Sequence, residues 1–167
     1  MFIMGQERDY IIHDDKSVKG FFGKYRFLSN FHLAGVWYEG ILYPSTEHAY
    51  QSAKTLDIDI RKEFLELSCN KAKNKGQVIG LRDNWDTIKY EVMFAVVFDK
   101  FTRHQDLKES LLLTGDMYLE ETNHWNDKYY GVCNGEGKNV LGKILMSVRN
   151  ILKSNPNYSG IPINFFE

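Results

Sequence analysis

The stretch that organises this sequence is YPSTEHAYQSAK, residues 43–54. Pro44 and Ser45 predict a boundary, because a proline ends a preceding extended segment and serine is a preferred helix N-cap. We therefore expect a helix to begin near Thr46.

One face of this predicted helix carries four polar side chains. Helical spacing of i, i+3, i+4 and i+7 brings together Glu47, Tyr50, Gln51 and Lys54. This stripe can face solvent or form the wall of a site, and the spacing alone leaves both open. Glu47 lies in the first turn, where unpaired backbone N–H groups and the helix dipole favour an ionised carboxylate. The stripe can therefore present a negative charge inside a pocket.

The composition is that of an ordinary globular protein. A chain of 167 residues predicts one domain with enough core to line a cleft. Its aromatic content of 14% indicates contacts with a planar ligand as well as core packing, which is the commoner use. The formal net charge of -1 argues against broad electrostatic binding of nucleic acid, so any such contact would be confined to a site.

The cysteines and the N-terminus indicate a cytoplasmic protein. Cys69 and Cys133 are far apart and lack CxxC spacing, which favours reduced thiols over a disulfide or a structural zinc site. The apolar run at residues 1–4 is too short for a signal peptide, and no segment approaches the length of a membrane span.

The chain before the central stretch predicts a hairpin. Residues 36–38 and 41–43 are apolar and flank Glu39-Gly40, where glycine permits the positive φ of a tight turn. Residues 1–19 are an N-terminal extension that adds an edge strand or stays loosely ordered. The hairpin delivers the chain to the helix that carries Glu47.

The rest of the chain is mostly helical. Periodicity and capping signals predict helices over residues 60–67, 70–78 with Asn70 as cap, 85–102, 105–113 and from Asn139 onward. The segment 85–102 is apolar nearly all round and should be the central buried helix. Residues 117–121 form a short strand. We expect a compact, mainly α fold (α+β with a small β element) over residues 20–153, and a tail, residues 154–167, docked by Phe165 and Phe166.

Residues 124–138 form a long polar loop with aromatic residues and glycines, and such loops are often functional. At its end, Gly135-Glu136-Gly137-Lys138-Asn139 precedes a helix and resembles an anion cradle, because backbone N–H groups at a helix start can bind phosphate. It is not a Walker loop. The plainer interpretation is a glycine-rich turn capped by Asn139.

Other polar and aromatic side chains have a plain structural interpretation beside a functional one. Glu47 can be a glutamate favoured only by the helix dipole, and His48 is better interpreted as a packed or surface histidine than as a catalytic base. A solvated face is the commoner role for Lys71, Lys73, Lys75 and Arg82, and core packing the commoner role for Trp85 and Trp125. Arg82 near Trp85 could hold a phosphorylated heterocycle between a guanidinium and an indole.

In order along residues 20–153, several motifs together resemble the NADAR family, also called YbiA-like. These are Phe27-Leu28-Ser29-Asn30-Phe31, residues 43–51 with Lys54, Arg82 with Trp85, Asp127 with Gly131, residues 137–142, Leu145-Met146 and Arg149. The resemblance implies a multihelical YbiA-like fold and cleavage of an N-glycosidic bond at ribose C1′. It also implies two substrate groups: phosphorylated ribosylamino-pyrimidine intermediates of riboflavin synthesis, and ADP-ribose attached to guanine bases.

The resemblance also assigns roles to residues. It implies that Glu47 is the catalytic carboxylate, with the neighbours Ser29, Asn30, Gln51, Lys54, Trp85 and Asp127. The chain departs from the family at Tyr130-Gly131, where many relatives have Trp-Gly, and in a short loop over residues 131–138. These departures bear on base or phosphate preference.

Loss of a base from C1′ passes through an oxocarbenium-like state, which a carboxylate can stabilise or supply with activated water. We expect Glu47 to be the principal catalytic residue and Asp127 to orient ribose or water. The base would stack on Trp85 or a tyrosine such as Tyr50 or Tyr130. Phosphate would bind to Lys54, Arg82 or the helix start formed by Gly137, Lys138 and Asn139. No metal or other cofactor is required.

Two other classes of function remain open. The pocket could belong to a non-catalytic module that binds NAD or ADP-ribose, and only Glu47 separates this alternative from the enzyme. A protein-interaction domain with a vestigial site is a third possibility, and it predicts no nucleotide-dependent thermal shift. The substrate can be a nucleotide-like small molecule or ADP-ribosylated nucleic acid, and the oligomeric state is open.

Overall fold

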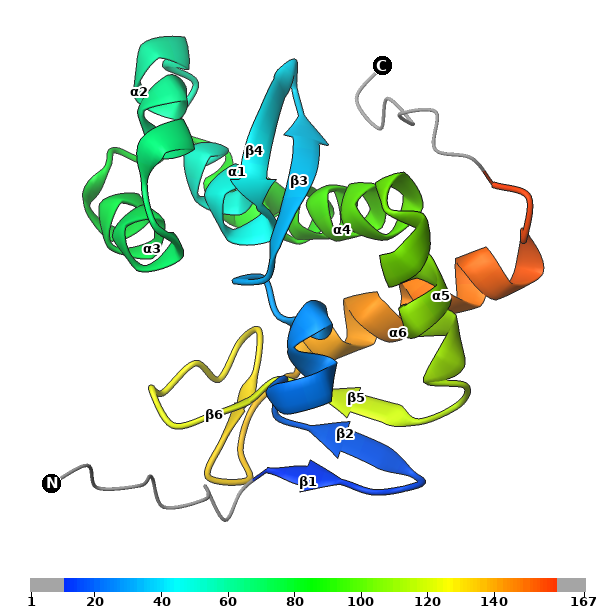
Figure 1. The fold of residues 1–167 in the computed structure, drawn as a ribbon. Coiled ribbons are helices and arrows are strands. Elements are labelled where there is room, and N and C mark those ends of the chain that lie inside the picture. The colour runs from blue at the N-terminus through cyan, green and yellow to red at the C-terminus, as the bar shows by residue number, and fades with distance from the viewer. Residues whose placement is uncertain (1–10, 159–167) are drawn as a thin grey trace, which may run out of the picture.

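The computed structural model describes residues 11–158, which form a mainly helical domain with three small sheets (Figure 1). The helices are α1 (Thr46–Ser52), α2 (Ile58–Glu63), α3 (Cys69–Val78), α4 (Trp85–Arg103), α5 (Gln105–Leu113) and α6 (Val140–Ser154), with the 3-10 helices η1 (Gly23–Leu28) and η2 (Phe64–Glu66). The strands are β1 (Ile12–His13), β2 (Ser17–Lys19), β3 (Leu33–Tyr38), β4 (Ile41–Ser45), β5 (Tyr118–Glu120), β6 (Thr122–Asn123) and β7 (Val132–Cys133). The predicted fold class is confirmed.

The predicted hairpin is formed by the antiparallel strands β3 and β4. Between them, Glu39 and Gly40 both have positive φ, at 43° and 86°, as in the two-residue turns that match strand twist. Strand β4 ends at Ser45, whose Oγ accepts a hydrogen bond from the backbone N–H of His48 at 3.3 Å. The hairpin therefore ends at the N-cap of α1, and the helix start predicted near Thr46 is confirmed.

Helix α4 lies at the centre of the core, as its apolar surface predicts. It packs against β3, α1, α5 and α6, and Val92, Val96 and Phe101 are fully buried. In Figure 1, α1 and α3 lie on one side of the molecule, while the sheet that contains β5 lies below α6, on the side away from the hairpin. Elements far apart in sequence are thus placed around one core.

The N-terminal strands join the domain. Strand β1 pairs with β2, and β2 pairs in parallel with β5. Both strands fall within residues 1–19, so part of the predicted extension forms the edge of a sheet. Residues 1–10 and 159–167, which include the predicted docking of Phe165 and Phe166, lie outside the described residues.

Two predicted helix caps are wrong. Helix α3 begins at Cys69, and its cap is Ser68, whose Oγ accepts from the N–H of Lys71 at 3.4 Å; Asn70 already lies inside the helix. Asn139 occupies the N-cap position of α6 with φ 51°, but its side chain makes no capping bond. Its amide instead donates to the carbonyl of Leu119 at 2.9 Å, because a tertiary contact with β5 takes up the side chain.

The sequence also led to expectations about His48, the two cysteines and membrane-spanning segments. His48 is a packed histidine, with its ring 2.6 Å from Ser45 Oγ and 2.8 Å from the Leu67 carbonyl oxygen. Cys69 and Cys133 are free thiols. Over residues 11–158, the structure contains no helix with the length and apolar character needed to span a bilayer.

Lys100 ties α4 to the segment that follows η1. Its Nζ donates to the carbonyl oxygens of Phe27 and Ser29 at 2.6 and 3.0 Å, and the side chain is buried. A Lys100→Met variant has a side chain of similar length but leaves both carbonyl acceptors without this donor. Since each unsatisfied buried acceptor costs about 1–3 kcal/mol, we expect the free energy of unfolding to fall by about 2–4 kcal/mol in denaturant titrations. The exposed Lys62 supplies the control Lys62→Met, which should change stability by less than about 0.5 kcal/mol. Equal stability of Lys100→Met and wild type would contradict this role.

Candidate active site

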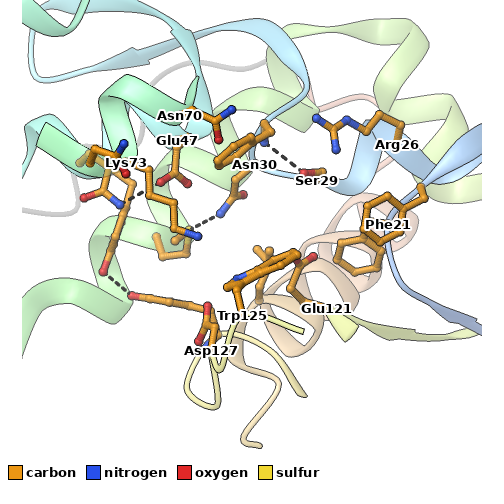
Figure 2. Close-up of a pocket in the computed structure, with 18 residues that line it drawn as sticks. Phe21, Arg26, Ser29, Asn30, Glu47, Asn70, Lys73, Glu121, Trp125 and Asp127 are labelled. Carbon is orange, nitrogen blue, oxygen red and sulfur yellow. Dashed lines mark hydrogen bonds between the residues drawn. The ribbon is translucent and has the colours of Figure 1, made fainter. Parts of the chain in front are cut away.

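A cavity of about 490 Å³ is lined by residues of α1, of α3 and of the loop that follows β6. Seven of the residues singled out from the sequence line it: Ser29, Asn30, Glu47, Tyr50, Gln51, Asp127 and Tyr130. Figure 2 shows side chains from separate elements directed into this space, among them Glu47 and Asn30. Three members of the predicted polar stripe, Glu47, Tyr50 and Gln51, therefore form a wall of the pocket. The fourth, Lys54, lies beyond the end of α1 at Ser52 and does not line the cavity.

Glu47 is held at this wall by neighbouring groups. Its backbone N–H donates to the Asn30 carbonyl at 3.1 Å, and its Oε1 accepts from the Gln51 side-chain amide at 2.9 Å. The side chain is 6% exposed, and burial raises the pKa of its carboxyl above the ordinary value. The Gln51 hydrogen bond and the ammonium groups of Lys73 and Lys54 oppose this rise, and the carboxylate of Asp127 adds to it. The expectation that the helix start favours ionisation is thus outweighed by desolvation.

Ser29 and Asn30 follow η1 and form the next part of the wall. Ser29 Oγ accepts from the backbone N–H of Phe31 at 3.1 Å, which fixes the turn. The Asn30 amide donates to the Met93 sulfur at 3.4 Å, a contact with the central helix. Because the Asn30 carbonyl also binds the Glu47 N–H, this segment and α1 form one rigid unit.

Asp127 is placed by a tightly bonded loop. Its Oδ1 accepts from the N–H groups of Tyr129 and Tyr130 at 3.1 and 2.9 Å. The side chain of Asn123 binds the Asp127 backbone on both sides, accepting from its N–H at 3.1 Å and donating to its carbonyl at 2.8 Å. The predicted functional loop therefore presents Asp127 to the cavity in a defined position.

Aromatic rings form the floor beside α1. The hydroxyl groups of Tyr130 and Tyr50 hydrogen-bond at 2.8 Å, and burial raises the pKa of both phenols. Trp85 packs on the Tyr50 ring with centroids 5.2 Å apart, but it is only 5% exposed and does not line the cavity. A base in the cavity can meet Tyr50 or Tyr130, while Trp85 supports them from behind.

The remaining sequence-predicted residues lie behind or beside the wall. Lys54 Nζ donates to the Gly76 carbonyl at 2.9 Å and ties the turn after α1 to α3. The Arg82 guanidinium donates to the Asn84 side chain at 2.9 Å, and Lys138 Nζ lies 5.5 Å from the Tyr129 ring centroid. None of these, nor Gly131 and Asn139, lines the cavity.

The predicted anion cradle is not available for phosphate. The N–H groups at the start of α6 are bonded to loop carbonyls: Asn139 to Gly131, Val140 to Tyr129 and Leu141 to Tyr130. The loop thus uses the helix N-terminus for its own folding, since these donors are satisfied within the protein.

Nine polar or aromatic pocket residues were not assigned to the site from the sequence: Phe21, Phe22, Arg26, Phe31, Asn70, Lys73, Asn74, Glu121 and Trp125. Asn70, Lys73 and Asn74 have i, i+3, i+4 spacing, the same signal that identified the stripe on α1. Lys73 Nζ lies 5.1 Å from the Trp125 ring centroid, and Trp125 is 42% exposed. The core interpretation is therefore correct for Trp85 and wrong for Trp125. No local signal distinguishes Glu121 from any glutamate at the end of a strand.

Within residues 11–158, no group of three or more His, Cys, Asp or Glu side chains is arranged to hold a metal ion. The absence of a cofactor stays a prediction. The pocket offers carboxylates, cations and aromatic rings, which suit a polar ligand with a planar part.

Comparison with known proteins agrees with this arrangement. The sequence profile of the NADAR domain matches residues 13–153. A riboflavin biosynthesis protein of Vibrio vulnificus is 34% identical over 142 residues, which cover 80% of this chain and 37% of that protein. The N-glycosidase YbiA of Shigella flexneri is 35% identical over 130 residues, 74% of this chain and 79% of that protein. The NMR structure of E. coli YbiA matches with a TM-score of 0.75 at 31% identity, covering 92% of this chain and 95% of that one.

Fold and relatives together define the class of protein as a hydrolase acting on N-glycosyl bonds. The chain belongs to the NADAR family, which confirms the resemblance found in the ordered motifs of residues 20–153.

Proposed function

We propose that the protein hydrolyses the C1′–N bond of a phosphorylated ribosylamino-pyrimidine, with Glu47 as the principal catalytic carboxylate. The observation that carries the proposal is the position of Glu47, buried at the wall of a cavity that also holds cationic side chains. A cavity of about 490 Å³ is in the range used for a single small ligand. The name of the Vibrio vulnificus relative, a riboflavin biosynthesis protein, favours this substrate over ADP-ribose attached to guanine.

In the proposed reaction, Glu47 activates water and stabilises the positive charge that develops at C1′. Asp127 orients the ribose or the water from the opposite loop. The pyrimidine lies against Tyr50, Tyr130 or Trp125, which are among the aromatic rings that line the pocket. The reaction takes place in the cytoplasm and needs no metal or other cofactor.

The direct test offers purified protein the two substrate classes separately and follows the products by mass. The proposal expects ribose 5-phosphate and free pyrimidine from the small substrate, and much slower release of ADP-ribose from ADP-ribosylated guanine in an oligonucleotide. Preferential release of ADP-ribose would show that the substrate is ADP-ribosylated guanine and not the ribosylamino-pyrimidine. Tight binding without cleavage of either compound would favour the non-catalytic nucleotide-binding module.

Arg26 is the proposed ligand of the substrate phosphate. It enters the cavity from η1, and in Figure 2 it lies on the side away from Glu47. A hydrogen bond to a charged group contributes about 1.5–3 kcal/mol, so Arg26→Met should raise KM for the phosphorylated substrate by about 10- to 100-fold. The dephosphorylated nucleoside should show little change, because it lacks the group that Arg26 binds.

The control for this experiment is Lys24→Met, because Lys24 is also on η1 but does not line the cavity. Its KM for the phosphorylated substrate should equal that of the wild type. If Arg26→Met raised KM by the same factor for the phosphorylated and the dephosphorylated substrate, Arg26 would have a role other than phosphate binding.

A further inference from the structure

Glu121 is a pocket carboxyl for which the sequence suggested no role. It follows β5, and its backbone is fixed on both sides: its N–H donates to Asn139 Oδ1 at 3.1 Å, and its carbonyl accepts from Val132 at 2.9 Å. The side chain lines the cavity (Figure 2), and its Oε2 is buried without a hydrogen-bond partner among the described residues. A buried polar atom without a partner is costly unless a ligand supplies one.

The environment of Glu121 differs from that of Glu47. Glu47 accepts a hydrogen bond from Gln51, which suits an ionised carboxylate, whereas Glu121 Oε2 accepts none. A carboxyl group in this position is satisfied when it carries a proton and donates it to an acceptor. Within the described residues no acceptor is bonded to Oε2, so the acceptor would be an atom of the ligand.

The charges that face Glu121 support the protonated form. Burial contributes most, the carboxylates of Asp127 and Glu47 add to it, and the cations Lys73 and Arg26 oppose it. Together they raise the pKa of Glu121 to about 8. Burial raises the pKa of Glu47 as well, so the two carboxyl groups are distinguished by their contacts: Glu47 accepts a hydrogen bond from Gln51, whereas Glu121 Oε2 has no hydrogen-bond partner among the described residues.

We propose that Glu121 is a second catalytic residue, which donates its proton to the heterocycle nitrogen as that nitrogen leaves ribose C1′. This role rests on the proposed function, since it needs a substrate with a C1′–N bond in the cavity. In this proposal Glu121 is the general acid and Glu47 is the general base.

The step is balanced in atoms and charge. The C1′–N bond breaks, its electron pair stays on nitrogen, and that nitrogen takes the proton of Glu121. The oxygen of water forms a bond to C1′, and the proton released from water passes to Glu47. The products are the free sugar and the neutral heterocycle, whose nitrogen now carries the proton from Glu121; Glu121 is left ionised and Glu47 protonated, and proton exchange with solvent restores both.

The test compares two substrates that differ in their need for an acid. The ribosylamino-pyrimidine 5′-phosphate has a poor leaving group, whereas 4-nitrophenyl riboside 5-phosphate releases a stable phenolate without protonation. We expect Glu121→Gln to lower kcat for the pyrimidine substrate by about 10²- to 10³-fold and for the nitrophenyl substrate by less than about tenfold. If Glu121→Gln lowered kcat by the same factor for both substrates, the proposal would be overturned.

The pH dependence of the wild type gives a second measurement that needs no variant. An acid acts only while protonated, so kcat/KM for the pyrimidine substrate should fall as the pH rises through about 8, the pKa of Glu121. With the nitrophenyl substrate this alkaline decline should be absent. An alkaline decline of equal size with both substrates would contradict proton donation to the leaving group.

Two controls separate the possible failures. Glu120→Gln alters the neighbouring strand residue, which is buried against Thr122 and does not line the cavity, and it should retain wild-type rates. Glu47→Gln should lose activity with both substrates, because neither can dispense with the base. A wild type that cleaves neither substrate would overturn the proposed function together with this one, whereas an active wild type with equally impaired Glu121→Gln reactions would overturn this inference alone.

Discussion

Replacing Glu47 by glutamine is expected to lower kcat by about 10³-fold, within the range for loss of a catalytic acid or base. Glutamine has nearly the same shape and can still accept a hydrogen bond from Gln51, so the pocket should keep its geometry. What disappears is the negative charge that would stabilise C1′ and the basic oxygen that would take a proton from water.

The same variant should be at least as stable as the wild type. Because burial raises the pKa of Glu47, ionising this carboxyl costs more in the folded state than in the unfolded state. The stability that this group contributes is therefore complete below its unfolded pKa and is lost as the pH rises through the folded one. A neutral amide avoids that loss, so thermal unfolding at neutral pH should show no decrease for Glu47→Gln.

The measurement is single-turnover cleavage of the ribosylamino-pyrimidine phosphate, with thermal unfolding on the same samples. Glu91→Gln removes an exposed carboxylate from α4 and should leave both quantities unchanged. If Glu47→Gln keeps a rate within about tenfold of the wild type while folded, Glu47 is not the principal catalytic residue.

Replacing Gly76 by alanine is the second change with a large expected effect. Gly76 lies on α3 where it packs against α1, and an added Cβ would lie 1.9 Å from Gln51 Oε1 and 2.7 Å from its Cδ. Gln51 would have to move, and it is the side chain that holds Glu47. Since a displacement of about 1 Å can reduce a rate by about 10²-fold, we expect activity to fall by a factor of that order.

Stability should also decrease for Gly76→Ala, although alanine is the better helix former. Overpacking costs about 1–3 kcal/mol, which exceeds the gain in helix propensity of about 1 kcal/mol. Rate measurements and denaturant titrations can be made on the same protein. Gly80→Ala is the matched control, because a Cβ there meets nothing within 4 Å, and it should retain both activity and stability. Wild-type activity for Gly76→Ala would show that the position of Gln51 does not matter for the reaction.

Local sequence patterns were sufficient to predict most of the helices and the hairpin. The Glu39-Gly40 turn, the Ser45 cap and the apolar pattern of residues 85–102 each depend on a few neighbouring residues, so they could be interpreted directly. The two caps that were predicted wrongly, Asn70 and Asn139, failed where another side chain or a strand competed for the same groups.

The residues of the candidate site could be predicted only in part from the sequence. The ordered motifs indicated the family, and seven of the predicted site residues line one cavity. Of the cations, Lys54 and Arg82 bind protein groups and do not line the cavity, whereas Arg26 and Lys73 do. Sequence spacing does not determine which of several exposed cations the packing of helices directs inward.

The amino-acid sequence therefore determined the helical architecture, the family and the polar stripe on which Glu47 lies. Tertiary structure decided which way that stripe faces: packing against α3, α4 and the Asn30 segment buries it at the cavity wall. It also brought Glu121 and Trp125 to the same cavity from the far end of the chain. The physical reason is that hydrogen bonds and periodicity within one element are local, whereas desolvation and the charge facing a carboxyl group depend on every element packed around it.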